Sequence, residues 1–228
     1  GMVFACSVCA GAEEKELEDR DILAKNAVVI DGTTGRILYG KNSEEKAAMA
    51  STTKIMTCIV ALENSKMDSI AEVSDRAVKM PKVHMGIRKG EKYYMKDLLY
   101  AMMLESYNDV AVCVAENVAG SVENFAKLMN KKAKKIGAYN TNFLTPNGLD
   151  AANHYSTAYD MAIIGAYAVK NKDFLKITNS KSYSFSNVER KRNFTVSNKD
   201  AFLTMDNNAI GIKTGFTGKA GYCFVGAV

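Results

Sequence analysis

The chain has 228 residues, of which 47% are hydrophobic and 24% charged. That composition supports one large domain, or two small ones, with a hydrophobic core. Lys and Arg number 30 against 25 Asp and Glu, so the net charge is only +5, and we expect no nucleic-acid partner. The densest basic runs, at 131–135 and 190–192, are typical of solvated helix faces or turns, with a weak attraction to anionic polymers as the alternative.

The first dozen residues are small and apolar, and they change abruptly to an acidic run at Glu13. This pattern is typical of the end of a secretory signal whose charged beginning is missing, and Gly1 before Met2 suggests a cloning remnant. We therefore expect residues 1–12 to be a remnant of a signal peptide or tag, residues 13–228 to form one domain, and the protein to be exported. No stretch reaches the ~20 apolar residues that a membrane-spanning helix needs.

The five cysteines do not predict a metal or redox site. Cys6 and Cys9 form a C-x-x-C, but a zinc site would need a second such pair or paired histidines. The two histidines, His84 and His154, stand far apart. The other three cysteines lie in apolar runs, which favours buried and inert thiols. We expect no metal and no cofactor.

In chain order, the first expected elements are a short surface helix over 13–25 and a β-hairpin with strands at 27–30 and 36–39. From about 46 to 180 the spacing of apolar residues is mostly helical. The segment 50–62 becomes apolar on nearly every face, which predicts a helix buried inside the protein. Further helices are expected at 96–104, 109–119, 121–136 and 157–169.

From about residue 181 the pattern changes to strands, expected at 182–185, 209–214 and 222–228. Strands at both ends of the chain and helices between them predict an α+β fold. We expect one antiparallel sheet built from about 13–45 and 181–228, with a helical part from about 46 to 180 inserted between its halves.

A serine nucleophile needs a base, and this sequence offers lysine rather than histidine. Ser51 opens the buried helix, and Lys54 lies one turn further on the same face. Burial and a second cation would depress the pKa of Lys54, so that it could take the serine proton. Ser43 and Lys46 have the same spacing, but in a polar, acidic stretch where the lysine would stay solvated. For Ser51, a helix N-cap followed by an ordinary lysine is the alternative.

Two short motifs follow in an order that fits this chemistry. Ser106 and Asn108 lie in an expected turn between two buried helices, where a hydroxyl could relay a proton and an amide could hold a peptide. Lys213, Thr214 and Gly215 close a strand, and they offer a cation, a hydroxyl for a carboxylate, and room for close approach of a substrate. Together with the Ser-x-x-Lys motif, these form the set found in penicillin-binding proteins and class A β-lactamases.

From about residue 27 to 228 the sequence resembles the serine D-alanyl-D-alanine carboxypeptidases, the low-molecular-mass penicillin-binding proteins of peptidase family S11. The resemblance rests on the three motifs and on longer segments at 147–150, 154–162 and 211–222. It implies a β-lactamase/transpeptidase-like α+β fold and a carboxypeptidase that trims the terminal D-Ala from peptidoglycan stem peptides. It also implies an extracytoplasmic location in the bacterial cell envelope, with β-lactams as inhibitors.

Carried onto this sequence, the resemblance implies that Ser51 is the acylated nucleophile, Lys54 its general base and Ser106 a proton relay. Asn108 would hydrogen bond the substrate peptide. On the strand, Lys213 and Thr214 would hold the terminal carboxylate, and Gly215 would let the substrate approach closely. The backbone N–H groups of Ser51 and Phe216 would form the oxyanion hole.

Two features depart from the family pattern. Tyr107 stands where the family usually has glycine, so its side chain either crowds the cleft or points away. The chain also ends within the strand at 222–228, before the family's next strand, long helix, C-terminal module and membrane-binding tail. We therefore expect a shortened sheet with two unpaired edges, which a neighbouring chain could complete. Peripheral membrane association is expected only through the missing C-terminal segment.

Two alternatives stay open on the sequence alone. One is a β-lactamase-like serine amidase on the same fold, for which Asp150 is a candidate deacylating residue. The other is a truncated, non-catalytic protein of this fold that binds wall peptides.

Overall fold

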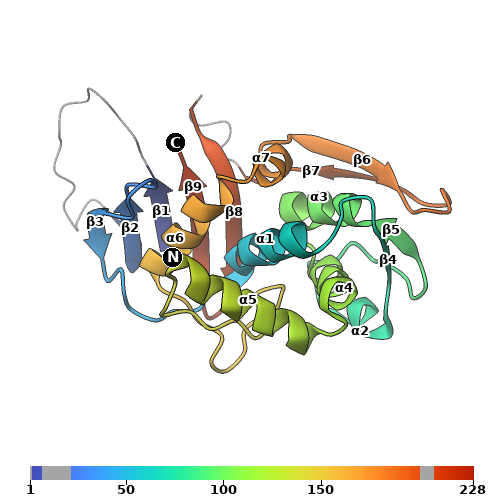
Figure 1. The fold of residues 1–228 in the computed structure, drawn as a ribbon, viewed down its shortest axis with the longest axis horizontal. Helices are drawn as coiled ribbons and strands as arrows, with labels where there is room; N and C mark the ends of the chain where they lie inside the picture. Colours follow the sequence, from blue (N-terminus) through green and yellow to red (C-terminus); the bar gives the residue numbers. More distant parts are fainter. Residues whose placement is uncertain (1, 7–21, 201–207) are drawn as a thin grey trace.

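The computed structural model describes residues 2–6, 22–200 and 208–228. A sheet lies at one end of the molecule, and most of the helices lie beside it and beyond it (Figure 1). The predicted α+β class is therefore confirmed. Most of the predicted helix over 13–25 lies outside the described residues.

The main sheet has five strands in the order β3-β2-β1-β9-β8. Their bounds are β1 Met2–Cys6, β2 Asn26–Ile30, β3 Ile37–Lys41, β8 Ile210–Thr217 and β9 Gly221–Ala227. The β2–β3 and β8–β9 pairs are the predicted antiparallel hairpins. The prediction of a wholly antiparallel sheet is wrong, because β1 lies between the hairpins and pairs in parallel with both β2 and β9.

β1 also changes the expectation of two unpaired strand edges. It follows β2 in register over all five residues, from Met2 opposite Asn26 to Cys6 opposite Ile30, and it meets β9 at Cys223. This strand comes from the segment that the sequence assigns to a leader or tag remnant. In this structure, the backbone groups along the inner edge of β2 are therefore paired within the chain.

Helix α1, Lys54–Asn64, runs through the centre of the helical part, and a short 3-10 turn over Ala50–Thr53 leads into it. All residues from Lys54 to Ala61 are buried, as predicted from their apolar composition. Around α1 pack α3 Met95–Glu105, α4 Asn108–Ala119, α5 Val122–Ile136, α6 Ala158–Ala168 and α7 Lys172–Thr178. Helix α6 also covers the sheet, where it contacts β1, β2 and β9.

Helix ends follow the signals in the sequence. The Ser121 side chain accepts a hydrogen bond from Asn124 N at the start of α5, and Thr157 caps α6 in the same way from Asp160 N. Gly120 and Gly137, with φ of 79° and 94°, end α4 and α5. These caps place the helices within one or two residues of their predicted bounds.

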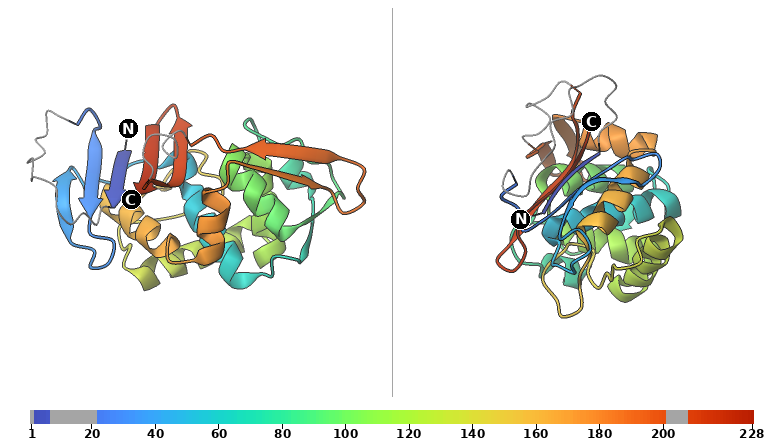
Figure 2. Two further views of the ribbon diagram at one scale, coloured as in Figure 1. Left: turned by 90° about the horizontal axis from the view of Figure 1, so that it is seen from above. Right: turned by 90° about the vertical axis from the view of Figure 1, so that its left-hand side faces the viewer.

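Two smaller sheets complete the helical part. β4 Ile70–Glu72 pairs with β5 Lys92–Tyr94, and the short helix α2, Asp75–Val78, lies between them in the chain. The predicted strand near residue 182 is β6, Ser182–Ser186, but it pairs with β7, Asn193–Ser197, rather than with the main sheet. This hairpin lies at the end of the molecule opposite β3 (Figures 1 and 2).

An aromatic contact attaches β6 to the helical part instead of the main sheet. Tyr183 stacks on Tyr100 of α3 with ring centroids 3.8 Å apart, and its hydroxyl donates to Asp97 Oδ1 at 2.7 Å. The hairpin is thus fixed to α3 through one face of β6. Among the described residues, no helix is long and apolar enough to cross a membrane.

Candidate active site

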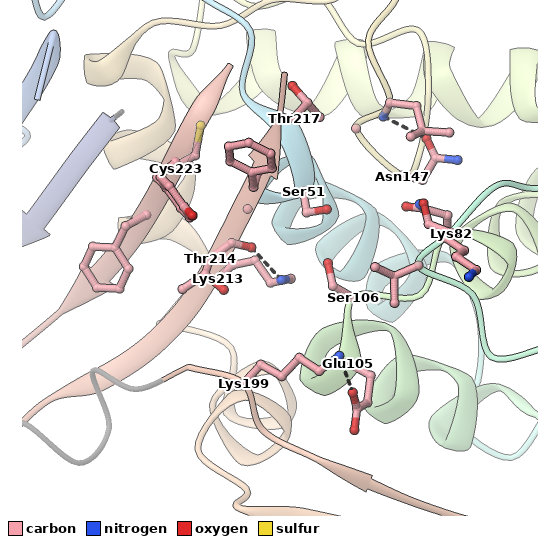
Figure 3. A pocket seen from close by; sticks show the side chains of 18 of the residues that line it. Ser51, Lys82, Glu105, Ser106, Asn147, Lys199, Lys213, Thr214, Thr217 and Cys223 are labelled. Carbon is pink, nitrogen blue, oxygen red and sulfur yellow. Dashed lines mark hydrogen bonds and ion pairs between the residues drawn. The ribbon is translucent and has the colours of Figure 1, made fainter. Parts of the chain in front are cut away.

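A cleft of about 790 Å³ opens between β8 and the helical part (Figure 3). Four segments of the helical part line it: the turn before α1, the loop at 82–83, the junction of α3 and α4, and the loop at 147–149. β8 and β9 line the opposite wall. All predicted site residues except Lys54 line this cleft, and Lys54 lies buried behind it.

Lys54 is the first residue of α1 and is fully buried. Its Nζ lies 3.0 Å from Ser51 Oγ, 3.0 Å from Asn108 Oδ1 and 2.6 Å from the carbonyl oxygen of Asn147. The structure thus brings two of the sequence motifs into direct contact through one side chain. The competing lysine, Lys46, is exposed and lies over the Tyr155 ring, 4.5 Å from its centroid.

Burial is the main cause that lowers the pKa of Lys54 well below its usual value. The positive charge of Lys213 lowers this pKa further, and the carboxylate of Asp109 opposes the shift. Lys213 is itself buried, which lowers its pKa to about 8, while Asp200 acts in the opposite direction. Both lysines are therefore easier to deprotonate than a lysine in water.

Asn108 connects the nucleophile region to the neighbouring loop at 82–83 on the same side of the cleft. Its Oδ1 accepts from Lys54, and its Nδ2 donates to the carbonyl oxygens of Pro81 at 3.4 Å and Lys82 at 3.2 Å. Because carbonyl oxygens only accept, these partners fix the orientation of the amide. Asn108 therefore positions Lys54 and the loop at the same time.

Ser106 is the C-cap of α3 and has a left-handed backbone conformation with φ of 66°. Its buried Oγ has no hydrogen-bond partner among the described residues, and it faces the cleft near Ser51 (Figure 3). A buried hydroxyl without a partner is costly, so this oxygen is well suited to interact with a bound molecule. Tyr107 packs against the hydrophobic core and does not line the cleft, so its side chain points away.

β8 packs against the turn that carries Ser51. A Cβ added to Gly215 would lie 2.7 Å from Ser51 N, closer than any side chain can come, so only glycine permits this approach. Lys213 donates from Nζ to the carbonyl oxygen of Thr214 at 2.7 Å. Phe216 is 58% exposed at the cleft rim, with its ring 4.8 Å from that of Tyr222.

A second glycine supports the nucleophile from the other side. Gly148 has φ of 84°, and a Cβ there would lie 1.9 Å from the carbonyl oxygen of Ala50. The backbone of the loop at 147–149 therefore lies directly against the peptide group that precedes Ser51. The same approach presents the Asn147 carbonyl oxygen to Lys54.

Sequence reasoning did not assign roles to Asn147 or Asp109. Asn147 acts on Lys54 through a backbone atom, so its side-chain type gives no signal, although the following glycine marks the turn. The buried carboxylate of Asp109 accepts from the backbone N–H groups of Met85, Gly86 and Ile87 at 2.9–3.3 Å. A charged residue within an apolar helix is the signal that would have marked Asp109.

His154 anchors the loop that contains Leu144 to the turn that contains Thr53. Leu144 N donates to Nδ1 at 3.0 Å, so Nε2 carries the proton and donates to Thr53 Oγ1 at 3.0 Å. Burial lowers the pKa of His154 to about 4. The ring is therefore neutral near pH 7, and it supports the turn next to Ser51.

The family model and the similar proteins of known sequence indicate the same family. The family model for D-alanyl-D-alanine carboxypeptidases, Peptidase S11, matches residues 12–228. The chain is 38% identical to the D-alanyl-D-alanine carboxypeptidase DacF of Bacillus subtilis over 228 residues, which cover 97% of this chain and 58% of that protein. It is 32% identical to DacC of Escherichia coli over 98% of this chain and 58% of the relative. The chain thus spans less than three fifths of the length of these curated relatives.

Solved structures agree in fold. A mutant of the Streptomyces K15 DD-transpeptidase superposes with a TM-score of 0.84 at 29% identity, covering 90% of this chain and 85% of that one. The D-alanyl-D-alanine carboxypeptidase of Mycobacterium tuberculosis gives a TM-score of 0.82 at 30% identity, covering 87% and 75%. The sequence resemblance, the family match and the fold lead to one conclusion: the chain belongs to the peptidase S11 family of D-alanyl-D-alanine carboxypeptidases.

Proposed function

We propose that this protein is a serine D-Ala-D-Ala carboxypeptidase, which removes the terminal D-Ala from peptidoglycan stem peptides through an acyl-enzyme on Ser51. The observation that carries the proposal is the buried amine of Lys54, 3.0 Å from Ser51 Oγ, with its pKa lowered by burial and by Lys213. Because the substrate lies outside the cytoplasm, we further propose an extracytoplasmic location in the bacterial cell envelope.

The hydrogen bonds around Lys54 support its role as general base. A neutral amine has two N–H donors and one lone pair. Asn108 Oδ1 and the Asn147 carbonyl oxygen can only accept, so they take the two N–H groups. The lone pair then points to Ser51, whose hydroxyl can donate. In this state Lys54 takes the Ser51 proton as Oγ attacks the scissile carbonyl carbon.

The carbonyl oxygen of the substrate becomes an oxyanion during attack. The backbone N–H groups of Ser51 and Phe216 are our candidates for its donors, and the close packing of Gly215 against Ser51 N supports this pairing. One such donor contributes about 3–4 kcal/mol to lowering the barrier. Lys213 and Thr214 would hold the terminal carboxylate, since both line the cleft beside Ser51.

Collapse of the tetrahedral intermediate breaks the amide bond, and the leaving D-Ala amine needs a proton. Lys54 returns that proton, with Ser106 as the relay, because its hydroxyl faces the cleft and has no partner among the residues described. Water then attacks the acyl-enzyme ester, Lys54 removes its proton, and the shortened peptide leaves. Asn108 would orient Lys54 and the acyl portion of the peptide. A β-lactam would acylate the same Ser51 oxygen.

The geometry does not favour the two alternatives. A class A β-lactamase uses an acidic group to activate the deacylating water. In the described part of the chain, Glu105 is the only acidic residue that lines the cleft, and it is paired with Lys199 at 2.7 Å. Asp150 accepts from Thr217 Oγ1 at 3.0 Å and does not line the cleft. The contacts of Lys54 with Ser51 and Asn108 do not favour a non-catalytic protein.

Labelling with a fluorescent penicillin tests the proposal. We expect stable labelling of the wild type and none of Ser51→Ala, together with release of D-Ala from an acylated D-Ala-D-Ala peptide. Ser43→Ala is the matched control, because Ser43 begins the competing motif and lies outside the cleft. It should label like the wild type. An unlabelled wild type, or a Ser51→Ala variant that labels fully, would contradict the proposal.

A further inference from the structure

We propose that Lys82 is a specificity residue that binds a carboxylate on the acyl portion of the substrate. The enzyme would therefore prefer peptides with a free carboxylate upstream of D-Ala-D-Ala over otherwise identical neutral peptides. This inference rests on the proposed function, and it concerns which stem peptides the site selects.

Lys82 lies at the end of the cleft that the acyl portion must occupy. In Figure 3, Lys213 and Thr214 lie on one side of Ser51, and Lys82 lies on the other. A substrate whose terminal carboxylate is at Lys213 and whose scissile carbonyl is at Ser51 must extend its remaining residues away from Lys213. That direction leads toward Lys82.

The backbone of Lys82 is held by contacts from α4. Asn108 N donates to the Val83 carbonyl oxygen at 2.7 Å, and Asn108 Nδ2 donates to the Lys82 carbonyl oxygen at 3.2 Å. The Asp109 carboxylate accepts from three successive backbone N–H groups further along the same loop. The backbone of the loop is thus fixed by the residues that follow Ser106, so the Lys82 side chain extends from a defined point beside the cleft.

The charge of Lys82 is not compensated by its surroundings. The charged residues that line the cleft are Lys82, Glu105, Lys199 and Lys213. Glu105 and Lys199 neutralise each other at 2.7 Å, and Lys213 is buried beside Thr214, where the terminal carboxylate would bind. Within the described ranges, the exposed Lys82 side chain makes neither an ion pair nor a hydrogen bond.

An uncompensated ammonium at the rim of a cleft selects carboxylates over amides of the same shape. The ligand class is therefore a stem peptide whose diamino acid, or a residue before it, carries a free carboxylate. Amidation of that carboxylate would remove the attraction without changing the size of the peptide.

A pair of isosteric peptides tests this inference. Nα-acetyl-Lys-D-Ala-D-Ala is prepared with a succinyl group or a succinamoyl group on the lysine side chain, so that the two differ only by a carboxylate in place of an amide. We expect wild-type kcat/KM for D-Ala release to favour the succinyl peptide by about two- to five-fold, as for an exposed ion pair. The preference should fall with added salt.

Variants assign the preference to one side chain. Lys82→Gln should bring the ratio of the two kcat/KM values to about 1, and Lys82→Glu should invert it. Lys79→Gln is the matched control, since it removes the same charge from an exposed residue nearby that does not line the cleft. It should keep the wild-type ratio. A wild type without preference, or a preference that persists in Lys82→Gln, would refute the inference.

The experiment distinguishes a failure of the carboxypeptidase proposal from a failure of the inference about Lys82. If the wild type releases D-Ala from neither peptide, the carboxypeptidase proposal is wrong. The affinities of Ser51→Ala for the two peptides, measured by calorimetry, then test Lys82 without any turnover. A succinyl preference that Lys82→Gln removes would support the inference, and equal affinities would refute it.

Discussion

At the scale of single residues, the site depends on Lys54, whose three hydrogen-bond partners favour a role as the base for Ser51. Two carbonyl-type acceptors take the N–H groups of Lys54, and the remaining neighbour is the Ser51 hydroxyl. Burial and the charge of Lys213 disfavour the ammonium form. Histidine is not required for this activation, and His154 instead holds the loop beside the serine.

The pH dependence of acylation tests the coupling between the two lysines. Lys54 acts as a base only when it is unprotonated, so acylation falls as the pH drops below its pKa. Lys213 lowers that pKa, and Lys213→Gln should therefore raise it and move the acid limb of the pH–rate profile to higher pH. The measurement is the second-order rate constant for acylation by a penicillin between pH 5 and pH 10.

Lys213→Arg is the control, because it keeps a cation at that position. Its acid limb should stay near that of the wild type. The pKa of Lys213 is about 8, so the wild type should lose activity above that pH as its cation is neutralised, and the arginine variant should retain it to higher pH. Equal acid limbs in Lys213→Gln and the wild type would contradict the coupling.

At the scale of elements, the long helices were predictable and the short strands were not. α3, α4 and α5 have continuous apolar faces and end at residues that cap helices, such as Gly120 and Gly137. β4 and β5 have three residues each, too few for alternation to be recognised. β6 was expected as a strand, but it packs on α3 through the stacking of Tyr183 on Tyr100, and such contacts between distant residues leave no periodic pattern in the sequence.

The same division holds for the candidate site. The side chains that the motifs carry lie together around one cleft. The contacts that hold them there were not predictable, because they come from a backbone carbonyl oxygen at Asn147 and from a carboxylate, Asp109, that binds backbone N–H groups. Residue types indicate which chemistry is available, whereas backbone contacts between distant segments are decided by the tertiary fold.

The packing of β8 against the nucleophile turn gives a prediction at this scale. In Gly215→Ala, the added Cβ would lie 2.7 Å from Ser51 N, so β8 must move away from the turn. We expect penicillin acylation to slow by about 10- to 100-fold, because small displacements of reacting groups have effects of this size. The rate constant for labelling measures the effect.

Gly218→Ala is the matched control for this variant. Gly218 lies just beyond β8, and a Cβ there would meet nothing within 4 Å. This variant should acylate at the wild-type rate. If both variants behave alike, the close approach of β8 to Ser51 does not determine reactivity.

At the scale of the whole molecule, the two chain ends meet in one sheet. β1 connects the β2–β3 hairpin to the β8–β9 hairpin (Figure 1). Residues of β8 line one wall of the cleft. Without β1, β2 and β9 would each expose a row of unpaired backbone groups. The first strand therefore supports the cleft, although it lies outside it.

Removal of residues 1–6 tests this role of β1. We expect the shortened chain to unfold at a lower temperature than the full chain and to associate at high concentration, since exposed strand edges pair between molecules. Thermal unfolding and size-exclusion chromatography at several concentrations measure both effects. The sequence-based expectation of a leader or tag remnant predicts no change. Identical unfolding and a monomeric shortened chain would favour that expectation.

The contact between Lys54 and the Asn147 carbonyl oxygen has a consequence for mutational robustness. Replacement of the Asn147 side chain would remove its contacts with Met80 Sδ and Leu149 N, but the carbonyl oxygen would still be present. The nearest hydrogen-bond partner of Lys54 Nζ is thus insensitive to a change of the Asn147 side chain alone. Replacing side chains one at a time would therefore fail to reveal that position 147 supplies a hydrogen-bond acceptor to Lys54. A substitution at Gly148 would displace this oxygen, because a Cβ there would lie 1.9 Å from the carbonyl oxygen of Ala50 and the backbone would have to move.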